Sequence, residues 1–200
     1  MSNIPFTHLH VHSQYSLLDG KATIPELVDK AIADGQRGIA LTDHGNMFGI
    51  KEFFNYVEKK NSGKPDEEKF KPIIGCEMYV AREKLTDKKD KTDNGYHLIV
   101  LAKNSTGYHN LVKLVSKAWT EGYYYKPRTD RTELALHREG LIVCSACLGG
   151  EVPQFIMHGD LDKAEERIVW YKETFGDDYY IELQRHETFK ENANREVFVE

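Results

Sequence analysis

The chain has 200 residues and a mass of 23.1 kDa, which fits one globular domain with a sizeable core. Apolar residues make up 40% and charged residues 30% of the sequence, which excludes collagen-like and wholly disordered proteins. The formal net charge of −5 is opposite in sign to that expected of a protein that binds duplex DNA through its phosphates. The 3 cysteines cannot all pair, and no apolar run is long enough for a membrane helix. We therefore predict a cytoplasmic protein without a membrane segment.

Short apolar runs alternate with helical patterns along the chain. Strands are expected at 6–11, 38–42, 71–80, 96–102, 141–146 and 179–184. Apolar residues at helical spacing predict helices at 24–32, 50–57, 108–119 and 161–175, and a further helix is expected to begin in 189–200. Thr23 and Glu26 form a capping box before the first helix, and Gly35 is placed to end it.

This alternation predicts an α/β domain with a mostly parallel sheet covered by helices. Two polar segments, 61–69 and 82–93, are expected to be solvated loops. About six strands are too few for an eight-stranded barrel. The sheet is therefore expected to be open, or the chain to stop before the barrel closes.

Metal-ligating side chains recur at the ends of the predicted strands. His10 and His12 share a face of the first strand with His8, because residues two apart in an extended chain point the same way. The strands that follow supply His44, Glu77, His97 and Cys147, and Asp19 follows the first strand. Imidazole, carboxylate and thiolate groups all bind zinc and related ions, and a carboxylate can bridge two of them. These residues predict a metal site around Glu77.

Three features of this pattern leave alternatives open. A lone histidine is more often a satisfied core residue than a ligand, and His97 begins its apolar run instead of ending it. Cys144 and Cys147 form a C-x-x-C pair, which we interpret as one ligand beside a buried thiol and not as a zinc ribbon or redox motif. The segment 123–128 interleaves tyrosines with basic residues. It could stack single-stranded nucleic acid, although a surface loop that covers a neighbouring helix is favoured.

Seven stretches, in order and over nearly the whole chain, resemble the polymerase and histidinol phosphatase (PHP) superfamily. The resemblance is greatest to the N-terminal PHP domain of bacterial DNA polymerase III alpha subunits. The stretches are HLHVHSQYSLLDG from His8, IALTDHGNMFG from Ile39, KPIIGCEMYVA from Lys71, HLIVLAKNSTGYHNLVKLVSKAW from His97, GYYYKPRTD from Gly122, GLIVCSACLGGEVP from Gly140 and YIELQRH from Tyr180.

The resemblance implies a distorted TIM-like (β/α)7 barrel that holds up to three divalent ions, zinc or manganese, at its carboxyl rim. The implied metal ligands are His10, His12, Asp19, His44, Glu77, His97 and Cys147. The resemblance also implies catalytic roles for Asp19, His44 and Glu77, with Glu77 as the bridging carboxylate. The family's last ligand motif, Asp-x-His, does not follow Gln184. Residues 1–200 are therefore expected to be the N-terminal part of a longer polymerase chain, and the barrel to lack its last strand.

The implied parent is the replicative DNA polymerase III alpha subunit, a DNA-directed DNA polymerase. Its expected partners are DNA, through the parent polymerase, and the other replicase subunits. The domain itself is expected to be a metal-dependent phosphoesterase or 3′–5′ exonuclease module, nearly inactive alone. An alternative is a non-catalytic module that braces the polymerase and docks a proofreading subunit. A free-standing small-molecule phosphatase is disfavoured by the stretches GYYYKPRTD and CLGGEVP.

Overall fold

The computed structural model describes residues 6–17 and 19–184, and the helix expected in 189–200 lies outside these residues. The helices are α1 (Ile24–Ala33), α2 (Ile50–Asn61), α3 (Ser105–Thr120), α4 (Arg131–Leu136), α5 (Glu151–Met157) and α6 (Leu161–Phe175). The strands are β1 (Gly38–Leu41), β2 (Lys71–Val80), β3 (Tyr96–Ala102), β4 (Tyr123–Tyr124), β5 (Lys126–Thr129), β6 (Leu141–Cys144) and β7 (Tyr179–Tyr180). Within the described ranges, every helix is too short or too polar to cross a membrane.

The start of α1 confirms the predicted capping box. The Thr23 side chain accepts a hydrogen bond from the amide of Glu26, and the Glu26 carboxylate accepts one from the amide of Thr23 at 2.8 Å. Gly35 follows the helix with φ of +74°, a left-handed conformation that glycine adopts without steric cost. Local sequence signals thus determine both ends of this helix.

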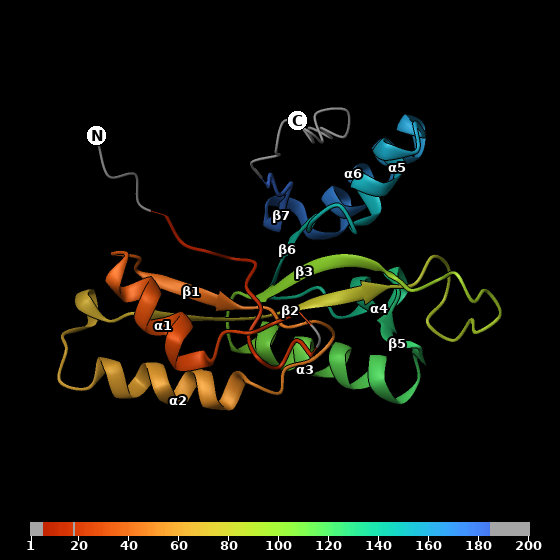
Figure 1. Ribbon diagram of the computed structural model, residues 1–200. Helices are drawn as coiled ribbons and strands as arrows, with labels where there is room; N and C mark the ends of the chain where they lie inside the picture. The colour runs from red at the N-terminus through yellow and green to blue at the C-terminus, as the bar shows by residue number, and fades with distance from the viewer. Residues whose placement is uncertain (1–5, 18, 185–200) are drawn as a thin grey trace, which may run out of the picture.

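β2 is the central strand of the sheet, whose order is β4-β5-β2-β3-β6-β7 (Figure 1). The second half of β2 pairs with β3 along one edge. Along its other edge, β2 pairs first with β1, then with an isolated bridge from His44 to Glu77, and finally with β5. The segment that follows β1 therefore leaves β2 at Glu77, and β5 takes its place.

The expectation of a mostly parallel sheet is wrong. β1–β2, β2–β5 and β6–β7 are parallel, whereas β2–β3, β3–β6 and β4–β5 are antiparallel. A parallel connection needs a long crossover, usually a helix, to return the chain to the starting edge. The segment between β2 and β3 contains no helix, so the chain turns back and β3 runs against β2.

The first expected strand, 6–11, lies beside β1 but does not form a regular ladder. The carbonyls of His8 and Val11 accept hydrogen bonds from the amides of Ala40 and Thr42, each at 2.9 Å. The two acceptors are three residues apart and the two donors only two apart. An extra residue therefore interrupts the pairing, as in a bulge, between His8 and Val11, the stretch that contains His10.

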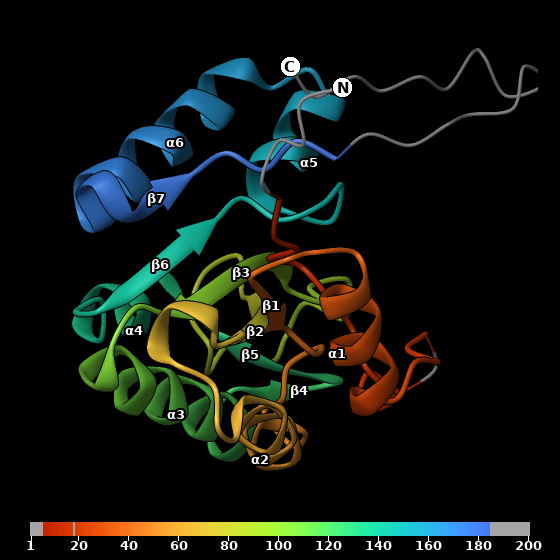
Figure 2. The same cartoon turned by 90° about the vertical axis from the view of Figure 1, so that its left-hand side faces the viewer.

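A closed barrel is not observed, because no backbone pairing among residues 6–17 and 19–184 joins β7 to the N-terminal segment. Only side chains connect them there, with His10 Nδ1 2.8 Å from Glu182 Oε1. Figures 1 and 2 show α5, α6 and β7 together at one end of the molecule and α2 and α3 at the opposite end. The fold is a mixed α/β domain with an open sheet.

The segment 123–128, for which we favoured a surface loop, lies in a short hairpin of β4 and β5 instead. Tyr123 stacks on Trp119 of α3, so it covers the neighbouring helix as expected. The loop 82–93 is largely exposed, as expected, but a buried ion pair anchors it. Arg128 is fully buried, and its guanidinium donates to the Asp93 carboxylate at 2.9 Å and to the Asp87 carbonyl at 2.6 Å. β5 thereby holds the loop against the body of the domain.

The two faces of the central strands have different roles. On β2, the side chains of Cys76, Met78 and Val80 join a core formed with α3 and α6. Glu77 and Tyr79 point to the opposite face, because successive residues of a strand alternate between faces. That face carries a smaller apolar cluster, which includes Ile99 and Cys144. Glu77 is therefore a carboxylate held on the inner face of the sheet.

Candidate metal centre

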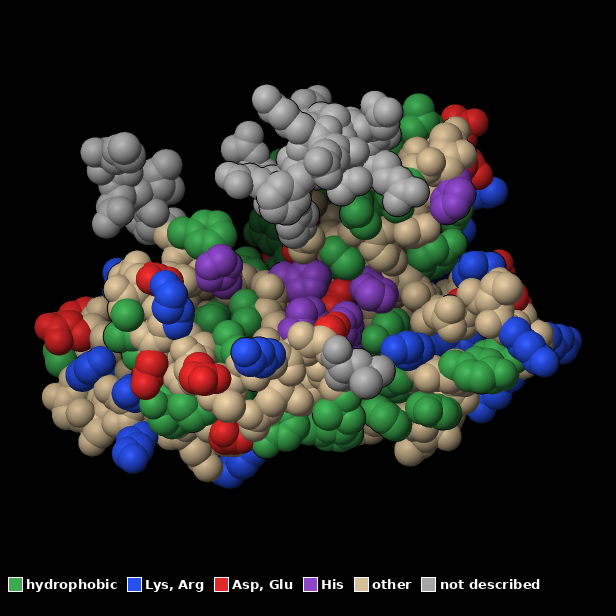
Figure 3. All heavy atoms as spheres, viewed as in Figure 1, with side chains coloured by type: hydrophobic (Ala, Val, Ile, Leu, Met, Phe, Trp, Pro, Cys, Tyr) green, Lys and Arg blue, Asp and Glu red, His purple; other side chains and the backbone are tan. Residues whose placement is uncertain are grey.

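The Glu77 carboxylate lies at the centre of the predicted ligand set and is 1% exposed. Its Oε2 atom lies 3.2 Å from His10 Nε2, 2.9 Å from His12 Nε2 and 2.9 Å from His44 Nδ1. Its Oε1 atom lies 2.8 Å from His97 Nδ1. Figure 3 shows histidine side chains gathered at the middle of one face of the molecule. The four histidines thus converge on one buried carboxylate.

The ligand atoms form two groups that share Glu77. His10, His12 and Glu77 make up the first, and His44, Glu77 and His97 the second, with the ligand atoms of each group within 4.8 Å of one another. Glu77 is the single residue common to both. Glu77 would therefore take part in holding a cation at either group.

The second nitrogen of each of three histidines has a polar partner. His10 Nδ1 lies 2.8 Å from Glu182 Oε1, and His44 Nε2 lies 2.8 Å from Asp19 Oδ2. Partners of this kind fix the orientation of a metal-binding imidazole. Asp19, predicted as a ligand, therefore lies next to His44 at the exposed edge of the centre.

The partner of His12 also fixes its tautomer. His12 Nδ1 lies 2.8 Å from Ser16 Oγ, and Ser16 donates its only hydroxyl hydrogen to the Asp43 carboxylate at 2.8 Å. Ser16 can therefore only accept from His12, so Nδ1 carries the hydrogen. The free electron pair is left on His12 Nε2, the atom that faces Glu77. Asp43 is buried and also accepts hydrogen bonds from the amide and hydroxyl of Ser13.

The antiparallel direction of β3 explains the position of His97. His97 is the second residue of β3 and pairs with Tyr79 near the end of β2. The start of an antiparallel strand lies beside the end of its neighbour, so His97 reaches the same edge as Glu77. The antiparallel pairing of β3 with β6 likewise brings the end of β6, at Cys144, beside Ile99.

Cys147 joins the centre through a tight turn after β6. Ala146 has φ of +63°, a left-handed conformation that is unfavourable for a residue with a side chain. Cys147 Sγ lies 3.5 Å from His97 Nδ1 and 3.7 Å from Glu77 Oε1. Cys144 is buried instead among apolar residues, and burial raises the pKa of its thiol to about 12. Cys147 alone of this C-x-x-C pair therefore reaches the centre.

Burial and charge act in opposite directions on the central groups. Burial lowers the pKa of His10, but hydrogen bonds to Glu182 and Glu77 outweigh it and raise the pKa to about 10. Burial also opposes protonation of His97, whereas Cys147 and Glu77 raise its pKa to about 9. Burial raises the pKa of Glu77, but the close approach of the surrounding histidines holds it far below its usual range.

The arrangement fits a divalent cation. Glu77 Oε2 and His44 Nδ1 are buried and lie 2.9 Å apart, yet neither has a well-aligned hydrogen bond within the described residues. The rings of His12 and His44 are stacked with centroids 4.2 Å apart, so two protonated rings there would repel each other. A cation would take up the electron pairs that these atoms direct at one another. Nitrogen, oxygen and sulfur donors together suit transition ions.

The sequence analysis did not select three residues that support the histidines of the centre, and it grouped with them one histidine that lies outside the centre. Glu182 contacts His10, Ser16 contacts His12, and Asp43 accepts a hydrogen bond from Ser16, but these three residues were not selected. A carboxylate near the end of a predicted strand was the available signal for Glu182. His8 is exposed and packs edge-on against Phe6, away from the ligand groups.

Comparison with known proteins identifies relatives of this chain. It is 49% identical over 183 residues to "DNA polymerase III subunit alpha" of Borreliella burgdorferi, with 90% of this chain and 15% of the relative covered. The protein of the same name from Treponema pallidum is 48% identical, covering 100% of this chain and 17% of the relative. The protein of the same name from Thermus aquaticus is 46% identical, and the match covers 92% of this chain and 15% of the relative. The chain thus spans about one sixth of the length of these relatives.

A solved structure and a family profile extend the comparison. The crystal structure of a proposed metal-dependent phosphoesterase from Bifidobacterium adolescentis is 12% identical, with a TM-score of 0.45 and 84% of each chain covered. The profile of the PHP domain matches residues 8–186, which include every predicted metal ligand. The chain therefore belongs to the PHP domain family.

Proposed function

We propose that this chain is the PHP domain of a DNA polymerase III alpha subunit and that its metal centre hydrolyses phosphate esters. Identities of 46–49% to proteins of that name over at least nine-tenths of the chain support the parent. DNA-directed DNA synthesis, contact with DNA and contact with other replicase subunits belong to this proposal. They concern a longer protein, of which the described domain is one part.

The observation that carries the hydrolytic function is the sharing of Glu77 by two groups of ligands. Two divalent cations held by these groups would supply positive charge for both the attacking and the leaving oxygen of a phosphoryl transfer. When bound, a divalent cation supplies Lewis acidity toward a phosphoryl oxygen and lowers the pKa of water. Zinc or manganese is the proposed metal, because the donor set combines imidazole, carboxylate and thiol groups.

The residues of the centre have separate proposed roles. His10, His12, His44 (through Nδ1), Glu77, His97 and Cys147 hold the cations from the inner face of the sheet. Asp19 and His44 lie at the mouth, where the Asp19 side chain is 53% exposed and the His44 side chain 21% exposed. A proton held between His44 Nε2 and Asp19 Oδ2 is placed to pass to a leaving oxygen.

The test combines metal content with hydrolysis. The chain is purified without added metal or chelator, and its metal is counted by mass spectrometry. Hydrolysis of bis(p-nitrophenyl) phosphate is then followed with zinc, with manganese and with chelator. We expect bound metal in the purified chain, and slow hydrolysis that chelator abolishes and that His44→Ala reduces at least tenfold, in the range of a lost general acid or base.

The matched control is His158→Gln, which removes an exposed imidazole at the end of α5, outside the centre. It should leave both metal content and hydrolysis unchanged. Bound metal without any metal-dependent hydrolysis would contradict the catalytic role and favour a structural module. Absence of bound metal would contradict the metal centre itself.

A further inference from the structure

A buried carboxylate lies just beyond the turn that carries Cys147. Glu151 is the first residue of α5 and is 3% exposed. Its Oε1 atom accepts hydrogen bonds from Arg131 Nη1 at 2.7 Å and from Arg167 Nε at 3.0 Å, and its Oε2 atom accepts one from the Tyr171 hydroxyl at 3.2 Å. We call these four residues, Glu151, Arg131, Arg167 and Tyr171, the Glu151 cluster. None of them belongs to the ligand set of the metal centre.

The Glu151 cluster joins three helices at one point. Arg131 begins α4, whereas Arg167 and Tyr171 belong to α6, and the Tyr171 ring lies in the core formed with β2. Arg131 also donates from Nη2 to the carbonyl of Arg82, which lies just after the end of β2, at 2.9 Å. A single carboxylate therefore fixes the start of α5 relative to α4, to α6 and to the sheet.

The turn between β6 and α5 lies directly against a histidine of the metal centre. The amide of Gly150 donates to the carbonyl of Cys147 at 2.8 Å, and the amide of Gly149 donates to Cys147 Sγ at 3.4 Å. The amide of His97 donates to the carbonyl of Gly149 at 2.9 Å. A Cβ added to Gly149 would lie 2.9 Å from the His97 ring, so the turn has no room to move closer. Cys147 thus takes its position from a turn that leads straight into Glu151.

The other end of this turn is attached separately. The amide of Ser145 donates to the carbonyl of Tyr180 at 3.0 Å, and the Ser145 hydroxyl accepts from the amide of Glu182 at 2.9 Å. Ala146 follows in its left-handed conformation, which a residue with a side chain keeps only where its surroundings impose it. Because the β6 end of the turn is bound to the segment around β7, the end at α5 is the one that depends on Glu151.

We propose that Glu151 is a positioning residue that fixes the Cys147 thiol in the metal centre. The inference rests on the proposed metal centre and adds to it a residue that is not itself a ligand. Residues outside the ligand set often determine how a ligand is oriented toward its metal. Two guanidinium groups share the Glu151 carboxylate, and loss of its charge would leave them buried without a charged partner. The start of α5 should then shift, and the turn 145–150 with it, while the ligands on β2 and β3 stay in place.

The first measurement needs no metal. Hydrogen exchange is followed by mass spectrometry with chelator present, and peptides that cover 145–150 are compared with peptides of α2. In Glu151→Gln the exchange rate across 145–150 should rise about tenfold, because glutamine keeps the size of the side chain but not its charge. The peptides of α2, which lies at the opposite end of the molecule (Figure 2), should exchange as in the unaltered chain.

The second measurement reports on the thiol itself. Cobalt(II) is added to the metal-free chain, the bound ions are counted, and the thiolate-to-cobalt charge-transfer absorption in the near ultraviolet is recorded per bound ion. Cys147→Ser gives the absorption in the absence of this thiol. Glu151→Gln should lose most of the difference between the unaltered chain and Cys147→Ser, while it still binds cobalt through imidazole and carboxylate groups. A residue with a merely structural role would lower stability without changing this absorption.

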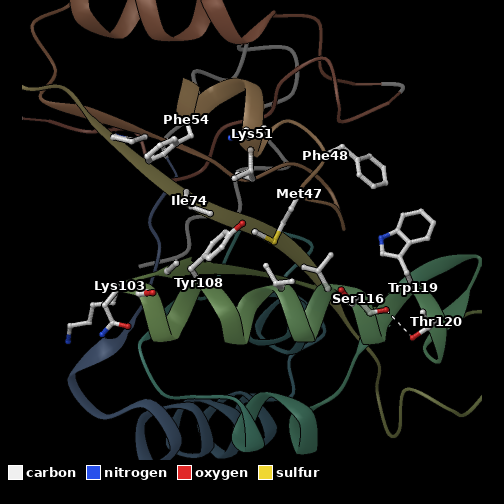
Figure 4. A pocket seen from close by; sticks show the side chains of 17 residues that line it. Met47, Phe48, Lys51, Phe54, Ile74, Lys103, Tyr108, Ser116, Trp119 and Thr120 are labelled. Atoms are coloured by element: carbon white, nitrogen blue, oxygen red, sulfur yellow. Dashed lines mark hydrogen bonds between the residues drawn. The ribbon is translucent and has the colours of Figure 1, made fainter. Parts of the chain in front are cut away.

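Two controls separate positioning from general destabilisation. Asn61→Asp exchanges an amide for a carboxylate at a buried position of α2, where the Asn61 side chain donates to the carbonyl of Phe70 at 2.9 Å and accepts from its amide at 2.8 Å. It should raise exchange at the end of α2 and leave the turn and the thiolate absorption unchanged. Lys103→Gln removes an exposed ion pair with Asp178, at one end of the groove between α2 and α3 (Figure 4), and should change neither measurement.

Arg167→Gln keeps the test decisive if Glu151→Gln does not fold. It removes one cation of the Glu151 cluster, whose side chain is 19% exposed, and leaves Arg131 on the carboxylate. Both measurements should therefore change in the same direction as in Glu151→Gln, by a smaller amount.

Unchanged exchange across 145–150 overturns the inference, and so does unchanged thiolate absorption per bound cobalt in both Glu151→Gln and Arg167→Gln. Cobalt binding without thiolate absorption in the unaltered chain contradicts the ligand role of Cys147 and overturns the inference with it. If the unaltered chain binds no cobalt, the proposed metal centre is contradicted. The exchange measurement then decides by itself, since faster exchange in Glu151→Gln supports the positioning of the turn and equal exchange refutes it.

Discussion

Replacing Glu77 by glutamine should remove metal from both ligand groups at once. Glu77 is the one residue that belongs to both, and each of its oxygens faces different partners. Glutamine keeps the size of the side chain but loses the charge and one of the two acceptor oxygens. By contrast, His12→Gln should reduce binding at the first group, and His97→Gln at the second.

The expected size of the effect follows from the burial of the carboxylate. Removing one charged partner from a buried, hydrogen-bonded cluster costs about 2–5 kcal/mol. A loss of about 3 kcal/mol weakens metal binding more than a hundredfold, since each 1.4 kcal/mol corresponds to a factor of about 10. A cation present at a hundred times its Kd stabilises the folded chain by about 2.7 kcal/mol. The variant would lose nearly all of this stabilisation at the same metal concentration.

Thermal unfolding with and without chelator measures this contribution. For a chain of this length, 1 kcal/mol shifts Tm by about 2–4 °C, so chelator should lower the Tm of the unaltered chain by about 5–11 °C. The Glu77→Gln chain should show almost no such decrease, and its metal content should fall correspondingly. His158→Gln is the control and should behave like the unaltered chain. If Glu77→Gln retains its metal and its response to chelator, the carboxylate is not the shared ligand.

Other parts of the domain give further expected outcomes. Arg128→Met leaves the buried carboxylate of Asp93 without its partner, so it should lower the free energy of unfolding by about 3–5 kcal/mol, measured by urea denaturation. Glu182→Gln removes an orienting carboxylate from a ligating imidazole and should weaken metal affinity about 10–100-fold in a metal titration, with an unchanged circular dichroism spectrum. Iodoacetamide at pH 8 should label Cys147 of the chelated, folded chain well before Cys144, because burial raises the pKa of the Cys144 thiol to about 12. Equal labelling of the two, measured by peptide mass spectrometry, would show that the chain opens around β6.

The sequence predicted local structure more reliably than strand direction. The capping box of α1 and the positions of α2, α3 and α6 follow from spacing and end residues, which are local properties. Strand direction depends on the connection. The polar segment 82–93 contains no helical pattern, and this was a sign in the sequence that β2 and β3 are joined as antiparallel neighbours.

The convergence of the predicted ligands could be expected from the sequence because strand ends of an α/β sheet tend to meet, but the residues that support them could not. Glu182 contacts His10 across 172 positions of sequence, and no local pattern reveals a contact of that range. Ser16 and Asp43 have ordinary residue types, and their importance arises from two hydrogen bonds that only the folded chain forms. Conversely, the resemblance implied the correct place for His97 while strand geometry alone did not, because that argument assumed a parallel β3.

Gly45 joins the candidate metal centre to the exposed side chain of Trp119 on α3. Its φ is +61°, and an added Cβ would lie 2.6 Å from Pro127 and 3.1 Å from Tyr79. Gly45 packs between Pro127 of the hairpin and Tyr79 of β2, and only glycine leaves room for the chain to turn there. The same turn presents His44 to Glu77 on one side and a carbonyl to Trp119 on the other. Because one backbone conformation sets both contacts, Trp119 is held in a fixed position relative to His44.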